Sequence, residues 1–229
     1  MHILVLDGNH IETEFRAKFG PAHEYTFLEN ALAGSATSDE NFQERGQAAM
    51  ASANVVFNFS NSTSHFLLAK PTAVPLFQEA TTSAMYSRHP QLSGFGFCGL
   101  PTLLNRPLLE IALSDKADAT KLAEVCAALG TDYRVVEDRV GLVTPRVVCM
   151  IINEACYTVQ EGTATMQDVD LGMKLGTNYP KGPFAWANAM GVERVYAVLE
   201  ALWNDTHDER YKICPLLKRQ ALRGELFAI

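Results

Sequence analysis

The stretch 138–188 constrains the fold more than any other part of this sequence, because a helical pattern of apolar residues continues through it almost without a break. Between positions 142 and 159 the apolar residues cover most of a helical wheel. A helix with so wide an apolar surface is expected to be packed on nearly every side. The polar residues that remain fall on one narrow stripe: Arg146, Asn153, Glu154, Thr158 and Glu161.

Turn and capping signals divide the rest of this stretch into two further helices. Thr165 followed by Asp168 has the Ser/Thr-x-x-acid form that caps a helix. That helix is expected to bury Val169 and Met173 and to stop at the next glycine. Pro183, whose φ is already helical and which needs no amide donor, suits the first turn of a third helix.

The remaining C-terminal residues continue the helical pattern. One amphipathic face repeats at helical spacing, formed by Val192, Val195, Tyr196, Leu199, Leu202 and Trp203. A last helix is expected over 215–226. Residues 138–229 are therefore predicted to form an all-α domain.

The first part of the chain alternates strands with helices. Strands are expected at 3–6, 24–28, 53–59, 72–77, 94–98, 108–112 and 133–136, with helices at 11–18, 38–52, 65–70 and 116–129. This alternation is typical of a doubly wound parallel sheet with right-handed connections. The sequence therefore predicts an α/β fold, in which an abbreviated Rossmann-like domain, 1–137, precedes the helical domain.

Composition excludes several classes of function. A net charge of −7 argues against nucleic acid as a partner, since binding to phosphate backbones needs clustered basic residues. The five cysteines show no C-x-x-C spacing, so we expect neither a metal site nor disulfides, and a cytoplasmic location. A membrane span at 140–159 is not expected, because Pro145, Arg146, Asn153 and Glu154 would lie inside the bilayer.

Short motifs near the start of the helical domain carry a family resemblance. Met173-Lys174-Leu175-Gly176, then Pro180, then Gly182-Pro183-Phe184 resemble the C-terminal domain of 3-hydroxyacyl-CoA dehydrogenases. Gly141, Leu142 and Arg146 resemble the family's entry to the preceding long helix. The resemblance covers about 92–202. It implies NAD-dependent hydride transfer at the 3-hydroxyl carbon of an acyl-CoA, and a homodimer formed through the helical domain.

The turn after the first strand differs from a dinucleotide-binding turn. Such a turn carries Gly-x-Gly-x-x-Gly so that the backbone can approach the pyrophosphate. Aligned on the strand end, these positions hold Asp7, Asn9 and Glu12. A carboxylate about 4 Å from a phosphate costs roughly 4 kcal/mol at an effective dielectric of about 20. We therefore expect no cofactor. In the alternative, NAD binds an unconventional nest formed by Gly8 and Asn9, with Glu29 on the ribose.

Four positions correspond to the catalytic groups of the family, in which a His-Glu pair takes the hydroxyl proton. Glu110 matches the family glutamate, but the histidine position is Gly96. The family's substrate-holding asparagine is replaced by Pro145, and Thr82 offers a hydroxyl where the family has a serine. Only Glu110 and Thr82 therefore remain as candidate catalytic residues, and without its histidine Glu110 is expected to be satisfied by backbone amides or solvent.

Three hypotheses follow for the function. In the first, the chain is a catalytically degenerate relative that keeps a cleft between its domains and binds an acyl-CoA-like small molecule there. In the second, it is an active NAD(P)-dependent oxidoreductase whose base is supplied by His65 or His89. In the third, it is a structural or partner-binding dimer.

Overall fold

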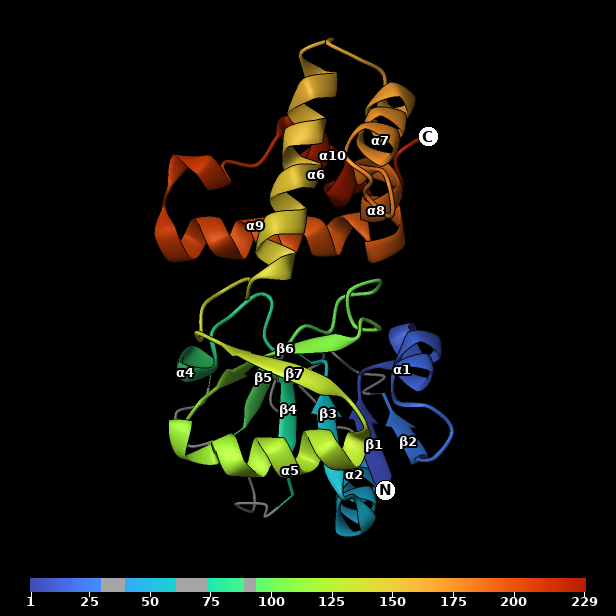
Figure 1. Cartoon of the computed structure of the whole chain (residues 1–229), viewed down its shortest axis with the longest axis vertical. Coiled ribbons are helices and arrows are strands. Elements are labelled where there is room, and N and C mark those ends of the chain that lie inside the picture. The colour runs from blue at the N-terminus through green and yellow to red at the C-terminus, as the bar shows by residue number, and fades with distance from the viewer. Residues whose placement is uncertain (30–39, 61–73, 89–93) are drawn as a thin grey trace. The chain divides into compact units, whose positions relative to one another are not determined.

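The computed structural model describes residues 1–29, 40–60, 74–88 and 94–229 (Figure 1). The chain divides into two compact units. The α/β unit contains Met1–Ala80, Ala84–Gly99 and Leu104–Arg139, and the helical unit contains Thr81–Ser83, Leu100–Leu103 and Val140–Ile229. Two short loops of the first part of the chain thus belong to the helical unit. The predicted helix 65–70 lies outside the described residues.

The described strands form one seven-stranded sheet in the order β2-β1-β3-β4-β5-β6-β7. Their bounds are β1 (His2–Leu6), β2 (Glu24–Leu28), β3 (Val55–Asn58), β4 (Leu76–Glu79), β5 (Phe95–Phe97), β6 (Leu108–Leu113) and β7 (Asp132–Val136). Most strands lie where the sequence predicts them. Of the predicted strand 72–77, residues 72–73 lie outside the described residues, and within the described part β4 begins at Leu76.

The sheet is parallel except where β5 meets β6, which is antiparallel, so β6 and β7 run against the other five strands. The prediction of a parallel sheet was wrong for this pair. A parallel neighbour needs a crossover of a dozen or more residues, usually a helix. The short connection 98–107 contains only turns, and the chain therefore reverses.

Helices pack on both faces of the sheet, as the doubly wound prediction requires. One face carries the larger core, where α1 (Glu12–Phe19) and α5 (Ala119–Leu129) cover the aromatic residues Phe57, Phe77, Phe95 and Phe97. The other face packs Leu4, Leu6, Val56 and Leu76 against α2 (Glu40–Ser52). The single-turn helices η1 (Asn9–Ile11) and η2 (Lys116–Asp118) precede α1 and α5, and α4 (Met85–Arg88) follows β4.

The helical unit contains α6 (Thr144–Gln160), α7 (Met166–Gly176), α8 (Pro183–Met190), α9 (Val192–Thr206), η3 (Glu209–Tyr211) and α10 (Pro215–Arg223). The long helix α6 is less enclosed than predicted, since Val143 beside its start is 50% exposed and Val147 is 52% exposed. No helix in the described ranges is long and apolar enough to cross a membrane.

Polar side chains of α6 form hydrogen bonds with the backbone that leads from η3 into α10. The Asn153 side chain is buried, donates to the carbonyl of Lys212 at 2.9 Å and accepts from the amide of Cys214 at 2.8 Å. About two turns farther along, Gln160 accepts from the amide of Leu216 at 3.0 Å. The side-chain amides of Asn153 and Gln160 therefore bond backbone groups of the segment 212–216, among them the buried amide of Cys214, which would otherwise lack a partner.

The Gly-Pro-Phe motif marks a cap shared between two helices. Asp170, on α7, is 9% exposed and accepts from the backbone amides of Phe184 at 2.7 Å and Ala185 at 2.9 Å. The carboxylate accepts from amides at the start of α8 that have no partner within the helix, and its negative charge is favourable beside the positive N-terminal end of the helix dipole. The prediction for the apolar side of α7 was wrong, because Val169 and Met173 are only half-buried and Asp170 is the buried residue of that helix.

Candidate functional site

The turn after β1 lies at the carboxyl edge of the parallel strands, where doubly wound sheets bind their ligands. Asp7 has a positive φ of 54°, and its amide donates to the carbonyl of Leu28 at 2.8 Å. Gly8 precedes η1 and has a φ of −108°, a value open to any residue. The glycine is therefore required for space rather than for backbone conformation.

The structure brings together the three residues predicted for a cofactor. Gly8 and Asn9 are consecutive in the turn, and the side-chain amide of Asn9 donates to the carboxylate of Glu29 at 3.0 Å. Glu29 thus already has a hydrogen-bond partner in the protein at the end of β2. The contact closes the turn onto the neighbouring strand.

The space at Gly8 is filled by protein side chains. A Cβ built at Gly8 would lie 2.5 Å from Cγ1 of Val5 and 2.9 Å from Cδ2 of Phe59. Glu12, in the first turn of α1, pairs with Arg16 at 2.8 Å. A pyrophosphate needs the backbone to be open at such a glycine and an electropositive helix end. Here side chains fill the space beside Gly8, and a carboxylate, that of Glu12, lies in the first turn of α1.

Glu110 is paired with a cation. It lies on β6, and its Oε1 is 3.4 Å from Nη2 of Arg106; the side chains are 8% and 31% exposed, respectively. The expectation that backbone amides or solvent would satisfy it was incomplete, because it did not include this guanidinium. Nothing in the sequence pattern indicated that the loop before β6 would turn Arg106 back onto the strand.

Gly96, at the position of the family histidine, is enclosed within the sheet. It pairs with Gln78 on β4 and with Ala112 on β6. A Cβ built there would lie 3.0 Å from Cγ of Met85, 3.1 Å from Cβ of Ala80 and 3.2 Å from Cβ of Ala112. Even one added carbon would be tight, and an imidazole would require these neighbours to move.

The other two family positions belong to the helical unit. Thr82 is half-buried in the loop Thr81–Ser83, and the carbonyl of Thr81 accepts from the amide of Gly141 at 3.0 Å. Pro145 is buried in the first turn of α6, where it provides neither an amide proton nor a polar side chain. His65 and His89, the alternative bases, lie outside the described residues.

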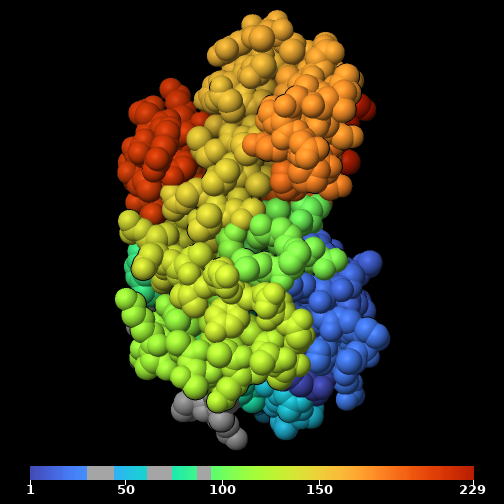
Figure 2. Space-filling model, in the orientation of Figure 1, coloured from blue at the N-terminus to red at the C-terminus, as the bar shows by residue number. Residues whose placement is uncertain are grey.

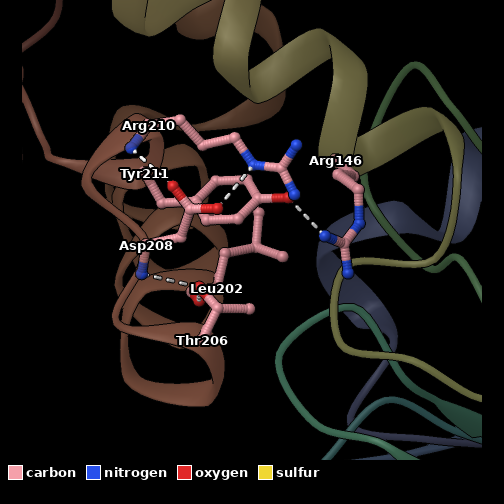
Figure 3. A network of polar contacts seen from close by, with 6 residues as sticks. All are labelled: Arg146, Leu202, Thr206, Asp208, Arg210 and Tyr211. Carbon is pink, nitrogen blue, oxygen red and sulfur yellow. Dashed lines mark hydrogen bonds and ion pairs between the residues drawn. The ribbon is translucent and has the colours of Figure 1, made fainter.

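Arg146 binds two groups of the helical unit at the entry to α6. Its guanidinium donates to the hydroxyl of Tyr211 and to the carbonyl of Val140, both at 2.5 Å. Figure 3 shows Arg146 reaching the Tyr211 hydroxyl from α6, and the guanidinium of Arg210 lies over the same ring, 4.7 Å from its centre. Gly141 has a φ of 82°, and a Cβ there would meet Leu202 at 3.0 Å. The motif therefore holds the start of α6 in place.

The buried thiols of Cys126 and Cys149 offer no substitute for the missing base. Desolvation by burial raises the pKa of Cys126 to about 11 and that of Cys149 to about 12, so both are protonated at neutral pH. Within the described ranges, no cluster of histidine, cysteine and acidic side chains is arranged to hold a metal ion.

A doubly wound sheet followed by a helical unit defines a Rossmann-like α/β protein with a helical C-terminal domain. The solved structure of (S)-3-hydroxybutyryl-CoA dehydrogenase from Ralstonia eutropha has this fold, with a TM-score of 0.69 and 18% identity over 98% of this chain and 94% of that one. The model of the 3-hydroxyacyl-CoA dehydrogenase C-terminal domain matches residues 141–227.

Curated relatives carry the identification further. A probable 3-hydroxybutyryl-CoA dehydrogenase of Bacillus subtilis is 30% identical over 71% of this chain and 56% of its own length. The 3-hydroxyadipyl-CoA dehydrogenase of Escherichia coli is 45% identical over 38% of this chain and 18% of its own length. The chain belongs to the 3-hydroxyacyl-CoA dehydrogenase family. It spans 56% of the length of the Bacillus subtilis relative and 18% of the length of the Escherichia coli relative.

Proposed function

We propose that this chain is a catalytically degenerate member of the family, which binds an acyl-CoA-like small molecule without transferring hydride. The observation that carries the proposal is the packing around Gly96, where Met85, Ala80 and Ala112 fill the space that an imidazole would need. Hydride transfer from an alcohol requires a group that takes the hydroxyl proton. Glycine has no such group.

Two other family positions support the same conclusion. Glu110 would orient and stabilise a histidine in the family arrangement, but here it pairs with Arg106. Pro145 lacks the side-chain amide that would hold a substrate carbonyl. Thr82 keeps a hydroxyl at the position where the family has a serine. Loss of the base together with retention of this hydroxyl favours binding over turnover.

Titration calorimetry with acetoacetyl-CoA and with NADH, together with an assay of NADH oxidation, tests this proposal. We expect saturable binding of acetoacetyl-CoA, no binding of NADH, and no oxidation above the rate without protein. A known 3-hydroxybutyryl-CoA dehydrogenase assayed in parallel provides the positive control. Turnover would instead support the active NAD(P)-dependent oxidoreductase. No binding of either ligand would support a structural or partner-binding dimer.

We also propose that the helical unit associates as a homodimer. The support is an apolar pair on α7, where Leu171 is 57% exposed and Leu175 is 77% exposed, one helical turn apart. In Figure 2 the surface of α7 faces the viewer in orange.

Light scattering after gel filtration tests this association. We expect twice the chain mass for the wild type and the chain mass for Leu171→Lys with Leu175→Lys, since burying two lysines without partners opposes association. Leu222→Lys, at a 69% exposed residue of α10, is the matched control and should keep the dimer. A wild type that is monomeric at all concentrations would contradict the proposal.

A further inference from the structure

The Phe59 ring is wedged between two glycines that are far apart in the sequence. A Cβ at Gly8 would meet Cδ2 of the ring at 2.9 Å and Cε2 at 3.1 Å. A Cβ at Gly99 would meet Cε1 at 2.7 Å and Cδ1 at 2.8 Å. The two opposite edges of one phenyl ring therefore lie against two glycine backbones, one after β1 and one after β5.

Other aromatic rings and the backbone hold Phe59 in this position. Its ring makes edge contacts with His10 at 5.8 Å and with Phe97 at 5.2 Å between ring centres. Its amide donates to the carbonyl of Leu6 at 2.9 Å. The preceding residue, Asn58, is fully buried and donates to the side-chain oxygen of Gln78 at 2.9 Å. The ring is thus fixed from the side and through the main chain.

The position of the ring is significant because of the strand order. β2 lies on one side of β1 and β3 on the other, so the chain changes direction across the sheet between β1 and β3. The crevice at such a switch point is where doubly wound sheets bind ligands. A glycine in the turn after the first strand normally lets a phosphate approach the backbone. In this turn Gly8, which lies between two of the family's glycine positions, lets a phenyl ring approach instead.

We propose that Phe59 is a built-in plug, which excludes a nicotinamide dinucleotide from the switch point by occupying the space beside Gly8. This inference deepens the proposed function and rests on it. The exclusion is steric, and it acts in addition to the repulsion expected from acidic residues such as Glu12.

Three variants distinguish the steric effect of the Phe59 ring on NADH binding from the effect of the Glu12 charge. Glu12→Gln removes the carboxylate at the third glycine position, and Glu12→Gln with Phe59→Ala also removes the ring. Glu12→Gln with Phe19→Ala is the matched control, because Phe19 is 6% exposed in the same core and packs against Phe15 and Phe57. The atoms nearest to a Cβ at Gly8 belong to Val5 and Phe59, not to Phe19. NADH affinity is measured for each by fluorescence titration, with circular dichroism to establish folding.

We expect the variant lacking Phe59 to bind NADH at least about tenfold more tightly than Glu12→Gln alone, a difference of about 1.4 kcal/mol. The Phe19 control should match Glu12→Gln. Phe59→Leu, which leaves part of the side-chain volume, should give a smaller gain and serves if the alanine variant does not fold. Equal NADH affinity with and without the ring, or strong NADH binding by the wild type, would contradict the proposal that Phe59 excludes the dinucleotide.

The two proposals fail in different ways. If acetoacetyl-CoA does not bind while removal of Phe59 still admits NADH, the proposed function is wrong and the plug stands. If acetoacetyl-CoA binds without turnover and removal of Phe59 changes nothing, the proposed function stands and the plug is wrong.

Discussion

Replacing Gly182 with alanine is expected to destabilise the helical unit by about 3–5 kcal/mol. The added Cβ would lie 2.2 Å from Cγ of Asp170 and 2.5 Å from its Oδ1, which is far inside van der Waals contact. The backbone of Gly182 has a φ of −67°, so conformation is not the constraint. To relieve the overlap, the carboxylate must leave the amides of Phe184 and Ala185, and α8 loses its cap.

Urea unfolding followed by tryptophan fluorescence measures this effect, since Trp186 and Trp203 both lie in the helical unit. Gly172→Ala is the matched control. Gly172 lies inside α7 with no atom within 4 Å of an added Cβ, so alanine there should stabilise by about 0.5–1 kcal/mol. A double variant with Asp170→Ala should cost little more than Asp170→Ala alone. A Gly182→Ala protein within about 1 kcal/mol of wild type would contradict the shared cap.

Introducing the family histidine at Gly96 is expected to restore no hydride transfer, even when combined with Pro145→Asn. The first carbon of the new side chain would already be 3.0–3.2 Å from three neighbours, and the ring needs further room. Overpacking of this kind costs about 1–3 kcal/mol. We therefore expect a less stable protein that does not oxidise NADH in the presence of acetoacetyl-CoA.

Gly96→Ala provides the control for this substitution, because it adds only the first carbon and should cost less than histidine. Pro145→Asn alone controls for the change at the start of α6. The assay is NADH oxidation with acetoacetyl-CoA, and urea unfolding reports the stability. Measurable turnover by the double variant would mean that the sheet accommodates an imidazole, and it would contradict the packing argument.

Local features of the fold were predictable from sequence, because they depend on neighbouring residues. Thr165 accepts from the amide of Asp168 at 3.1 Å and caps α7, as its spacing indicated. Pro183 begins α8, and β2 occupies the predicted residues. The alternation of strands and helices was sufficient to predict a doubly wound Rossmann-like sheet followed by helices.

The candidate site was predictable only in part. The sequence showed that Gly96 and Pro145 replace the family's catalytic histidine and substrate-holding asparagine and that Glu110 keeps the family's glutamate. It did not show that Arg106 pairs with Glu110 or that Gly96 is enclosed by Met85. Each of these contacts joins residues whose distance in space depends on how strands and loops pack, and no local pattern records it.

The sequence by itself determined the order and type of the elements, the helix caps and the missing catalytic groups, since periodicity, turn chemistry and side-chain identity are local properties. The tertiary structure alone decided the reversal at β6, the burial of Asp170 and the wedging of Phe59 between Gly8 and Gly99. These features arise from close packing between distant segments, where a few tenths of an ångström decide which group occupies a given space.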